Sequence, residues 1–161
     1  MPTNSLEQRH AWMREAIRLS QESVDTGGGP FGAVIVQGDQ IVGRGQNRVT
    51  TANDPTAHAE IVAIRQACES LGTFTLAGCE IFTSCEPCPM CLGAILWARL
   101  DCVWYANTRE DAANIGFDDS TFYDEMTRPL NNRQLPMSPL LRDEAQSAFK
   151  TWQQSENKTR Y

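Results

Sequence analysis

The sequence predicts a layered α/β domain in which helices pack on a sheet. Three features predict it: an opening amphipathic helical pattern, two short β-branched runs, and a later alternation of strand and helix patterns. The chain has 161 residues, of which 41% are apolar and 21% are charged. This composition is typical of one globular domain with a buried core. We therefore expect one domain over residues 1–161, and disordered, collagen-like and coiled-coil structures are excluded.

Seven elements are expected over the first two thirds of the chain. Their ranges are 5–26, 57–71 and 89–99 for helices and 33–36, 41–43, 80–83 and 102–106 for strands. The first helix is expected to start at an Asn4 cap and to end before the glycines at 27–29. Gly38-Asp39 between the first two strands is typical of a hairpin, so these strands are expected to be antiparallel. The later strand-helix-strand order predicts right-handed crossovers with helices packed on the sheet.

The last third of the chain has a weaker pattern. A short helix is expected over residues 118–126, and a loop containing three prolines over residues 127–139. Apolar residues at helical spacing from Leu141 to Trp152 predict a terminal helix.

Composition also narrows the class of partner. The net charge is −6 at pH 7, whereas nucleic-acid binders usually carry a basic face, so we expect no nucleic-acid partner. No apolar stretch approaches the ~20 residues of a membrane-spanning helix, and no basic and apolar leader opens the chain. We therefore expect a cytoplasmic protein with no membrane partner.

Cysteines are concentrated in one part of the sequence. The chain has six, and Cys85, Cys88 and Cys91 lie close together. Reducing compartments keep thiols free, so this cluster indicates metal binding or catalysis rather than disulfides. The other three are expected to be small apolar residues of the interior.

Two expected helices begin with side chains of the types that bind metal ions in proteins. His58-Ala59-Glu60 opens one of them, and Pro87-Cys88-Pro89-Met90-Cys91 opens the other. Zinc favours four tetrahedral positions with thiolate and imidazole ligands, and a catalytic site leaves one position to water. His58, Cys88 and Cys91 therefore predict one catalytic zinc ion per chain. The only other histidine, His10, lies within the first helix and is expected to be packed or on the surface.

Glu60 is expected to move protons rather than to bind the metal. Residues two apart diverge by about half a turn inside a regular helix, so His58 and Glu60 converge only at a helix entrance. The turn residues Asp54-Pro55-Thr56 favour that placement. Beside a zinc ion, a carboxylate in this position is suited to general acid–base catalysis.

A structural zinc site remains an alternative. Cys85 lies three residues before Cys88 and would be a fourth ligand, which would leave no position for water. Pro87 and Pro89 restrict the backbone between Cys85 and the helix, and a closed site would leave Glu60 without a role. We therefore favour the open site.

Several segments carry a resemblance to a known family. His-x-Glu with Pro-Cys-x-x-Cys marks zinc-dependent nucleobase deaminases. The segments Thr56–Glu60 and Thr83–Ile95 resemble the cytidine and deoxycytidylate deaminase superfamily. Within it, the chain resembles the bacterial guanine deaminases over nearly its whole length, and the further matching segments are 29–36, 46–47, 53–56 and 116–120.

The resemblance implies a fold and a reaction. The fold is a three-layer α/β/α sandwich of the cytidine deaminase-like type, with helices on both faces of a central mixed sheet of about five strands. The fifth strand is expected near residues 133–138. The reaction is the zinc-dependent hydrolytic deamination of guanine to xanthine and ammonia, with Glu60 as the catalytic residue and a small-molecule purine as the substrate.

The resemblance also implies substrate contacts, for Asn47, Phe31, Ala59, Asp119 and Tyr161. Asn47 would hydrogen-bond the purine edge, Phe31 would stack on the base, Asp119 would accept hydrogen bonds from it, and Tyr161 would close the pocket. Four of these residues also have a purely structural interpretation. These are a turn asparagine for Asn47, a core phenylalanine for Phe31, a helix cap for Asp119 and a frayed terminus for Tyr161.

A homodimer with exchanged C-terminal segments, about residues 127–161, is implied as well, with Tyr161 acting in the partner's site. Three alternatives to the guanine reaction remain. A tRNA adenosine deaminase shares the zinc motif, but a basic docking surface is expected of it. A cytosine, cytidine or guanosine deaminase is possible on the same core. From a different class comes a zinc-stabilised binding module, which requires the closed four-ligand site.

Overall fold

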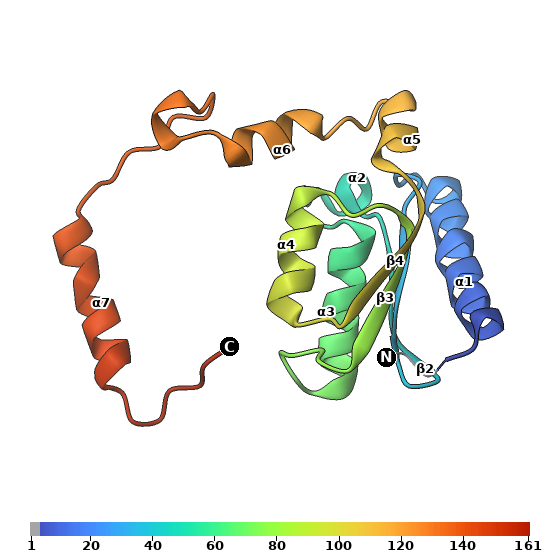
Figure 1. Ribbon diagram of the computed structural model, residues 1–161, viewed down its shortest axis with the longest axis horizontal. Helices are drawn as coiled ribbons and strands as arrows, with labels where there is room; N and C mark the ends of the chain where they lie inside the picture. Colours follow the sequence, from blue (N-terminus) through green and yellow to red (C-terminus); the bar gives the residue numbers. More distant parts are fainter. Residues whose placement is uncertain (1–3) are drawn as a thin grey trace. The chain divides into compact units, whose positions relative to one another are not determined.

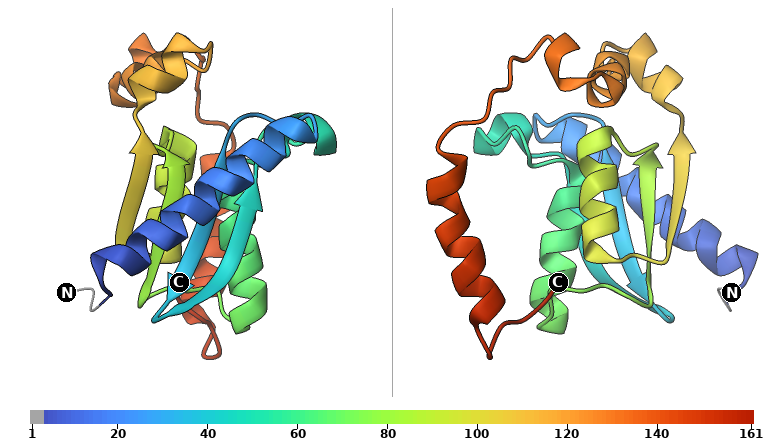
Figure 2. Two further views of the ribbon diagram at one scale, coloured as in Figure 1. Left: turned by 90° about the vertical axis from the view of Figure 1, so that its right-hand side faces the viewer. Right: turned by 60° about the vertical axis from the view of Figure 1, so that its left-hand side comes forward.

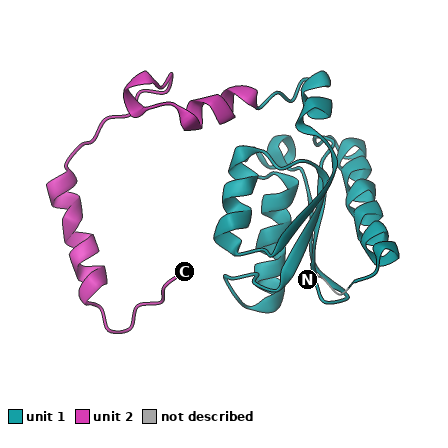
Figure 3. Ribbon diagram, viewed as in Figure 1, with its two compact units in different colours: residues 1–119 teal, residues 120–161 magenta. Residues whose placement is uncertain are grey.

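The computed structural model describes residues 4–161, and the chain divides into two compact units, one up to Asp119 and one over residues 120–161 (Figure 3). The elements of the first unit are α1 Leu6–Asp25, β1 Gly32–Gln37, β2 Gln40–Gln46, α2 Val49–Ala52, α3 Ala59–Leu71, β3 Cys79–Cys85, α4 Pro89–Ala98, β4 Cys102–Asn107 and α5 Arg109–Asn114 (Figure 1). All seven elements expected from the sequence are present in the expected order. The two short helices α2 and α5 were not predicted.

The sheet has four strands in the order β2-β1-β3-β4. β1 pairs antiparallel with both β2 and β3, and β3 pairs parallel with β4, so the sheet is mixed. The expected fifth strand is wrong, because residues 133–138 form no strand. Pro136 has no N–H for a ladder, and the N–H of Leu135 donates instead to Glu125 Oε1 at 2.9 Å.

Helices cover both faces of the sheet, which confirms the three-layer arrangement. Val34, Val36 and Phe82 pack with apolar residues of α1 on one face. On the other face, Ala33, Ile35 and Ile81 form one core with residues of α3 and α4. Successive residues of β1 alternate between the two cores, as the period of a strand requires. Figures 1 and 2 show α1 on one side of the sheet and α3 and α4 on the other.

α3 lies unusually close to β2 because β2 carries glycines where the helix crosses it. A Cβ atom at Gly43 would overlap the carbonyl oxygen of Ala63, and one at Gly45 would overlap that of Ala59. Both glycines are buried. Backbone therefore packs on backbone, and this contact sets the position of the first turn of α3, which follows His58.

We expect Gly45→Ala to lower the free energy of unfolding by about 3 kcal/mol or more, because overpacking against a helix backbone has no flexible neighbour to relax it. Urea denaturation measures the change. Gly93→Ala is the matched control, since a Cβ there has no heavy atom within 4 Å. In helix α4 it should raise stability by up to about 1 kcal/mol. Equal effects of the two substitutions would contradict the close approach.

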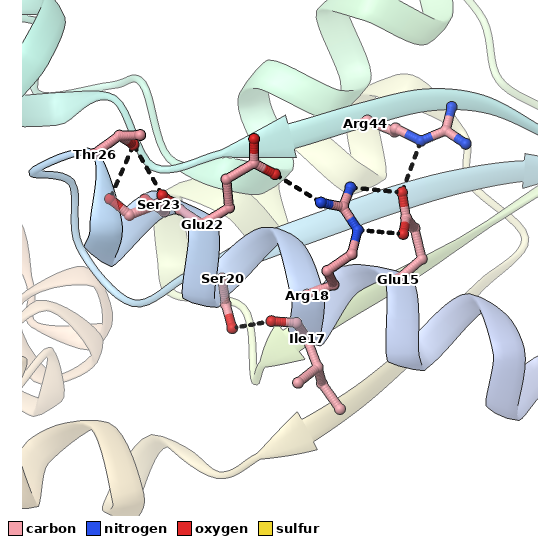
Figure 4. A network of polar contacts seen from close by, with 8 residues as sticks. All are labelled: Glu15, Ile17, Arg18, Ser20, Glu22, Ser23, Thr26 and Arg44. Carbon is pink, nitrogen blue, oxygen red and sulfur yellow. Dashed lines mark hydrogen bonds and ion pairs between the residues drawn. The ribbon is translucent and has the colours of Figure 1, made fainter.

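A polar network on α1 joins this helix to the sheet (Figure 4). Glu15 accepts hydrogen bonds from Arg18 on the same helix at 2.8 Å and from Arg44 of β2 at 3.0 Å. The bond from Arg18 is the main reason that the pKa of Glu15 falls to about 2. The carboxylate is therefore ionised at neutral pH and bridges the helix and the strand.

The start of α1 differs from the expectation by one residue. Ser5, not Asn4, is the N-cap, and its hydroxyl accepts the N–H of Gln8 at 3.2 Å. The Asn4 side chain donates to the carbonyl of Gly38 at 3.0 Å. A contact with the hairpin therefore decided between two good capping residues.

The second unit comprises α6 Ser120–Thr127, the 3-10 helix η1 Leu130–Asn132 and α7 Arg142–Gln154. Both helices expected in this part of the sequence are present. None of residues 120–161, all of which the structure describes, is buried. Among the exposed apolar side chains, Phe149 and Trp152 lie on α7.

Within residues 4–161, no helix combines the length and hydropathy that crossing a bilayer requires.

Candidate active site

The predicted zinc-binding residues lie at two helix entrances. His58 is the N-cap of α3, with an extended backbone at φ −68° and ψ 156°. Cys88 is the N-cap of α4, at φ −67° and ψ 169°, and Pro89 occupies the first turn. Because His58 is not inside the helix, Glu60 is free to approach the same region. The expected placement of His58 and Glu60 at the entrance of a helix is therefore found.

The three potential ligand atoms have the spacing of a zinc site. His58 Nδ1 lies 3.6 Å from Cys88 Sγ and 3.5 Å from Cys91 Sγ. Tetrahedral zinc at ordinary bond lengths holds a nitrogen and a sulfur about 3.5 Å apart. In the part of the chain that the structure describes, this is the one group of three or more such side chains. Zinc therefore fits His58, Cys88 and Cys91, at one ion per chain.

The two thiols are electrostatically unequal. A hydrogen bond from Cys91 lowers the pKa of Cys88 to about 4, and the bond to His58 acts in the same direction. The bond to Cys88 and burial raise the pKa of Cys91. The pair alone therefore favours one thiolate and one thiol. A divalent cation supplies the charge that stabilises both as thiolates, as metal binding with proton release requires.

Glu60 is buried beside the zinc-binding residues. It is the second residue of α3 and is only 6% exposed, and the side chains of Cys88, Cys91 and His58 all act on its pKa. The hydroxyl of Thr83 lies 3.5 Å from Glu60 Oε1 and 3.0 Å from the carbonyl oxygen of Cys85. Burial is the largest cause that raises the pKa of Glu60. A carboxyl with a raised pKa that stands next to the metal ligands is suited to proton transfer.

Sequence reasoning gave Thr83 no role. Its one signal was a hydroxyl residue inside the apolar strand β3, directly after Ile81 and Phe82. Thr83 is 1% exposed. Its contact with Glu60 spans 23 residues of sequence and becomes visible only when α3 packs on the sheet.

Cys85 is buried at the end of β3 and is not part of the ligand group. Its thiol donates to the carbonyl oxygen of Thr108 at 3.6 Å. Burial raises the pKa of this thiol to about 11, and it stands outside the group formed by His58, Cys88 and Cys91. The geometry therefore favours three protein ligands over four.

We expect Cys85→Ala to retain one zinc per chain, because the substitution removes a core thiol and no ligand. Metal content measured by plasma mass spectrometry on purified protein tests this. A zinc content near zero would support the closed four-ligand site.

The predicted substrate-contact residues differ in their surroundings. Asn47 is buried after β2, and Ala59 is buried at the first position of α3. Phe31 packs against the core and meets Phe117 edge-on at 5.0 Å between ring centroids. Burial raises the pKa of Asp119, and the charge of Cys88 is the second cause, so this carboxyl lies within electrostatic reach of the ligand group. Tyr161 ends the second unit and is 74% exposed.

Comparison with known proteins identifies the family. Residues 6–107 match the family model described as the cytidine and deoxycytidylate deaminase zinc-binding region. The match spans more than half of the chain, which therefore belongs to this family of zinc-binding deaminases.

Within this family, the chain is similar to guanine deaminases over most of its length and to a tRNA-specific adenosine deaminase over a shorter part. Guanine deaminase from Bacillus subtilis (strain 168) is 51% identical over 151 residues, which cover 93% of this chain and 97% of the relative. The solved structure of guanine deaminase from Bacillus subtilis superposes with a TM-score of 0.91 over 94% of this chain and 98% of that one, at 50% identity. A guanine deaminase from Nitrosomonas europaea gives a TM-score of 0.65 at 32% identity, over 88% and 82% of the two chains. The tRNA-specific adenosine deaminase of Aquifex aeolicus is 38% identical over 59% of this chain and 63% of its own length.

Proposed function

We propose that this chain catalyses the hydrolytic deamination of guanine to xanthine and ammonia. The observation that carries the proposal is a three-residue group suited to zinc with a buried carboxyl, Glu60, close enough for all three side chains to act on its pKa. The similarity to guanine deaminases, which extends through the segment after the zinc-binding region, supports guanine as the substrate.

The roles of the chain's own residues follow from their positions. His58, Cys88 and Cys91 would hold the zinc ion, which would supply the Lewis acidity that makes water a nucleophile near neutral pH. Glu60 would accept a proton from water as the water oxygen bonds to C2. It would deliver protons to the ring nitrogen and to the C2 amine, whose bond to carbon then breaks to release ammonia. The backbone N–H of Ala59 lies at the start of α3. Backbone N–H groups at a helix start stabilise developing negative charge.

The remaining predicted contacts select the base. Asn47 donates hydrogen bonds to the purine edge, Asp119 accepts them, and Phe31 stacks on the ring. Such contacts discriminate strongly, because a wrong base leaves buried polar groups unpaired. We also propose that the enzyme acts in the cytoplasm, where reducing conditions keep zinc thiolates out of disulfides.

An ammonia-release panel tests the proposed substrate. We expect guanine to be turned over with a kcat/KM at least about a hundredfold above guanosine, adenine, cytosine, cytidine and a tRNA anticodon stem-loop, the scale at which unpaired buried polar groups discriminate. A preference for the stem-loop would favour the tRNA adenosine deaminase alternative, which the acidic net charge of −6 disfavours. No ammonia from any of them would favour the binding module.

We further propose that the active unit is a homodimer in which residues 127–161 are exchanged and Tyr161 completes the partner's site. The state of the second unit supports this: none of residues 120–161 is buried, and large apolar side chains along it are exposed. An amphipathic helix such as α7 gains its stability from packing of its apolar face. A partner subunit would supply that packing.

A complementation experiment distinguishes two cases: Tyr161 acts in the partner's site, or it acts in the site of its own chain. Glu60→Gln and a chain lacking Tyr161 are expected to be weakly active alone. After mixed refolding, a heterodimer with exchanged segments contains one site with both Glu60 and Tyr161, so activity should rise. If Tyr161 acts in its own chain, no site of the heterodimer is intact and the mixture stays as inactive as its parts.

A further inference from the structure

Ser23 is a buried polar residue to which the proposed reaction assigns no role. It lies near the end of α1 and is 1% exposed. Its hydroxyl donates to the backbone carbonyl of Asn47 at 3.2 Å, across 24 residues of sequence. Its own carbonyl accepts the N–H of Gly28 at 2.7 Å and the hydroxyl of Thr26 at 3.2 Å, the latter drawn in Figure 4. Ser23 therefore connects α1, the glycine loop (residues 27–29) and Asn47.

The glycine loop packs directly against these two residues. A Cβ at Gly28 would lie 2.5 Å from both the Asn47 carbonyl oxygen and the Ser23 Oγ. One at Gly29 would lie 3.3 Å from Asn47 Cγ. A side chain at Gly28 would displace the hydroxyl or the carbonyl, so the absence of a side chain is required for this contact.

The orientation of the Asn47 amide is fixed by the backbone. Oδ1 accepts the N–H of Gly29 at 3.4 Å and the N–H of Val49 at 3.2 Å. Backbone N–H groups are donors only, so the oxygen must face them, and the NH2 group keeps its donors for a ligand. The N–H of Arg48 donates to the carbonyl of Ala57 at 2.8 Å, which ties this loop to the residue before His58.

We propose that Ser23 is a positioning residue for substrate recognition, which fixes Asn47 so that its amide N–H groups meet acceptor atoms on the purine edge. This inference rests on the proposed function. Guanine offers such acceptors in its carbonyl oxygen and unprotonated ring nitrogens. Ser23 touches neither the substrate nor the zinc ligands and acts through Asn47.

Steady-state kinetics of Ser23→Ala test the inference. We expect KM for guanine to rise about fivefold, the equivalent of one hydrogen bond, with kcat within about twofold of wild type and zinc content unchanged. Ser23→Cys keeps a weaker hydrogen-bond donor, so its KM for guanine should lie between those of wild type and Ser23→Ala. Ser20→Ala is the matched control, because the Ser20 hydroxyl donates to Ile17 of its own helix at 2.7 Å (Figure 4). A merely structural Ser23 would lower the active fraction, and so kcat, without moving KM.

A double-mutant cycle shows whether Ser23 acts through Asn47. Asn47→Asp keeps an oxygen for the Gly29 and Val49 N–H groups but removes the N–H donors, so its KM should rise more than that of Ser23→Ala. In that background, Ser23→Ala should raise KM no further. An additional full increase, or an unchanged KM in Ser23→Ala alone, overturns the inference while guanine turnover by wild type stands. Absence of guanine turnover by wild type overturns the proposed function, and this inference with it.

Discussion

Glu60→Gln is expected to lower kcat for guanine by at least about a hundredfold, the usual scale for a proton-transfer residue. Glutamine preserves the shape of the side chain and keeps a polar group beside the Thr83 hydroxyl, which lies 3.5 Å from Glu60 Oε1. It carries no transferable proton at neutral pH. Because the residue is 6% exposed, removal of a titratable group there should not destabilise the fold.

Zinc content and urea denaturation accompany that measurement. We expect one zinc per chain and a free energy of unfolding equal to or above that of wild type. Glu69→Gln is the control, since Glu69 lies on the same helix α3 and is exposed, and it should retain full activity. A kcat for Glu60→Gln within about threefold of wild type would remove Glu60 from the mechanism, because proton-transfer residues contribute far more than that.

Cys91→Ala is expected to reduce both zinc content and activity to background. Cys91 is 0% exposed, and its sulfur lies 3.5 Å from His58 Nδ1. Two remaining protein ligands cannot hold a catalytic zinc in place of three. The variant should also unfold at lower urea concentration than zinc-loaded wild type, because metal that binds the folded state stabilises it by mass action.

Cys85→Ala is the matched control for this loss, since it removes a buried thiol that does not belong to the ligand group. Zinc and activity should persist in Cys85→Ala and disappear in Cys91→Ala. The reverse pattern, or equal loss in both, would mean that the ligand set has been assigned wrongly.

The elements and the zinc group were predictable because their signals are local. Helical and strand periodicities fixed the order of seven elements, and His58 and Cys88 sit at helix entrances marked by nearby prolines. The start of α5 carries a local signal as well. Thr108 and Asp111 form a capping box at its start.

Contacts made by tertiary packing were not predictable in this way. The bond from Ser23 to Asn47 joins residues 24 apart, and the Thr83 contact with Glu60 joins residues 23 apart. The expected strand near Pro136 rested on family resemblance, and a side chain of the same unit, Glu125, holds the neighbouring N–H instead. Pattern reasoning lists donors and acceptors but does not say which of several partners each one meets.

X-ray absorption at the zinc edge of the purified, active chain tests the central claim most directly. The account predicts two sulfur ligands at about 2.3 Å and two lighter ligands at about 2.0–2.1 Å, one of them an imidazole and the other exchangeable water. The spectrum of Cys85→Ala should be the same. Three sulfur ligands, with one lost in Cys85→Ala, would contradict an open hydrolytic centre.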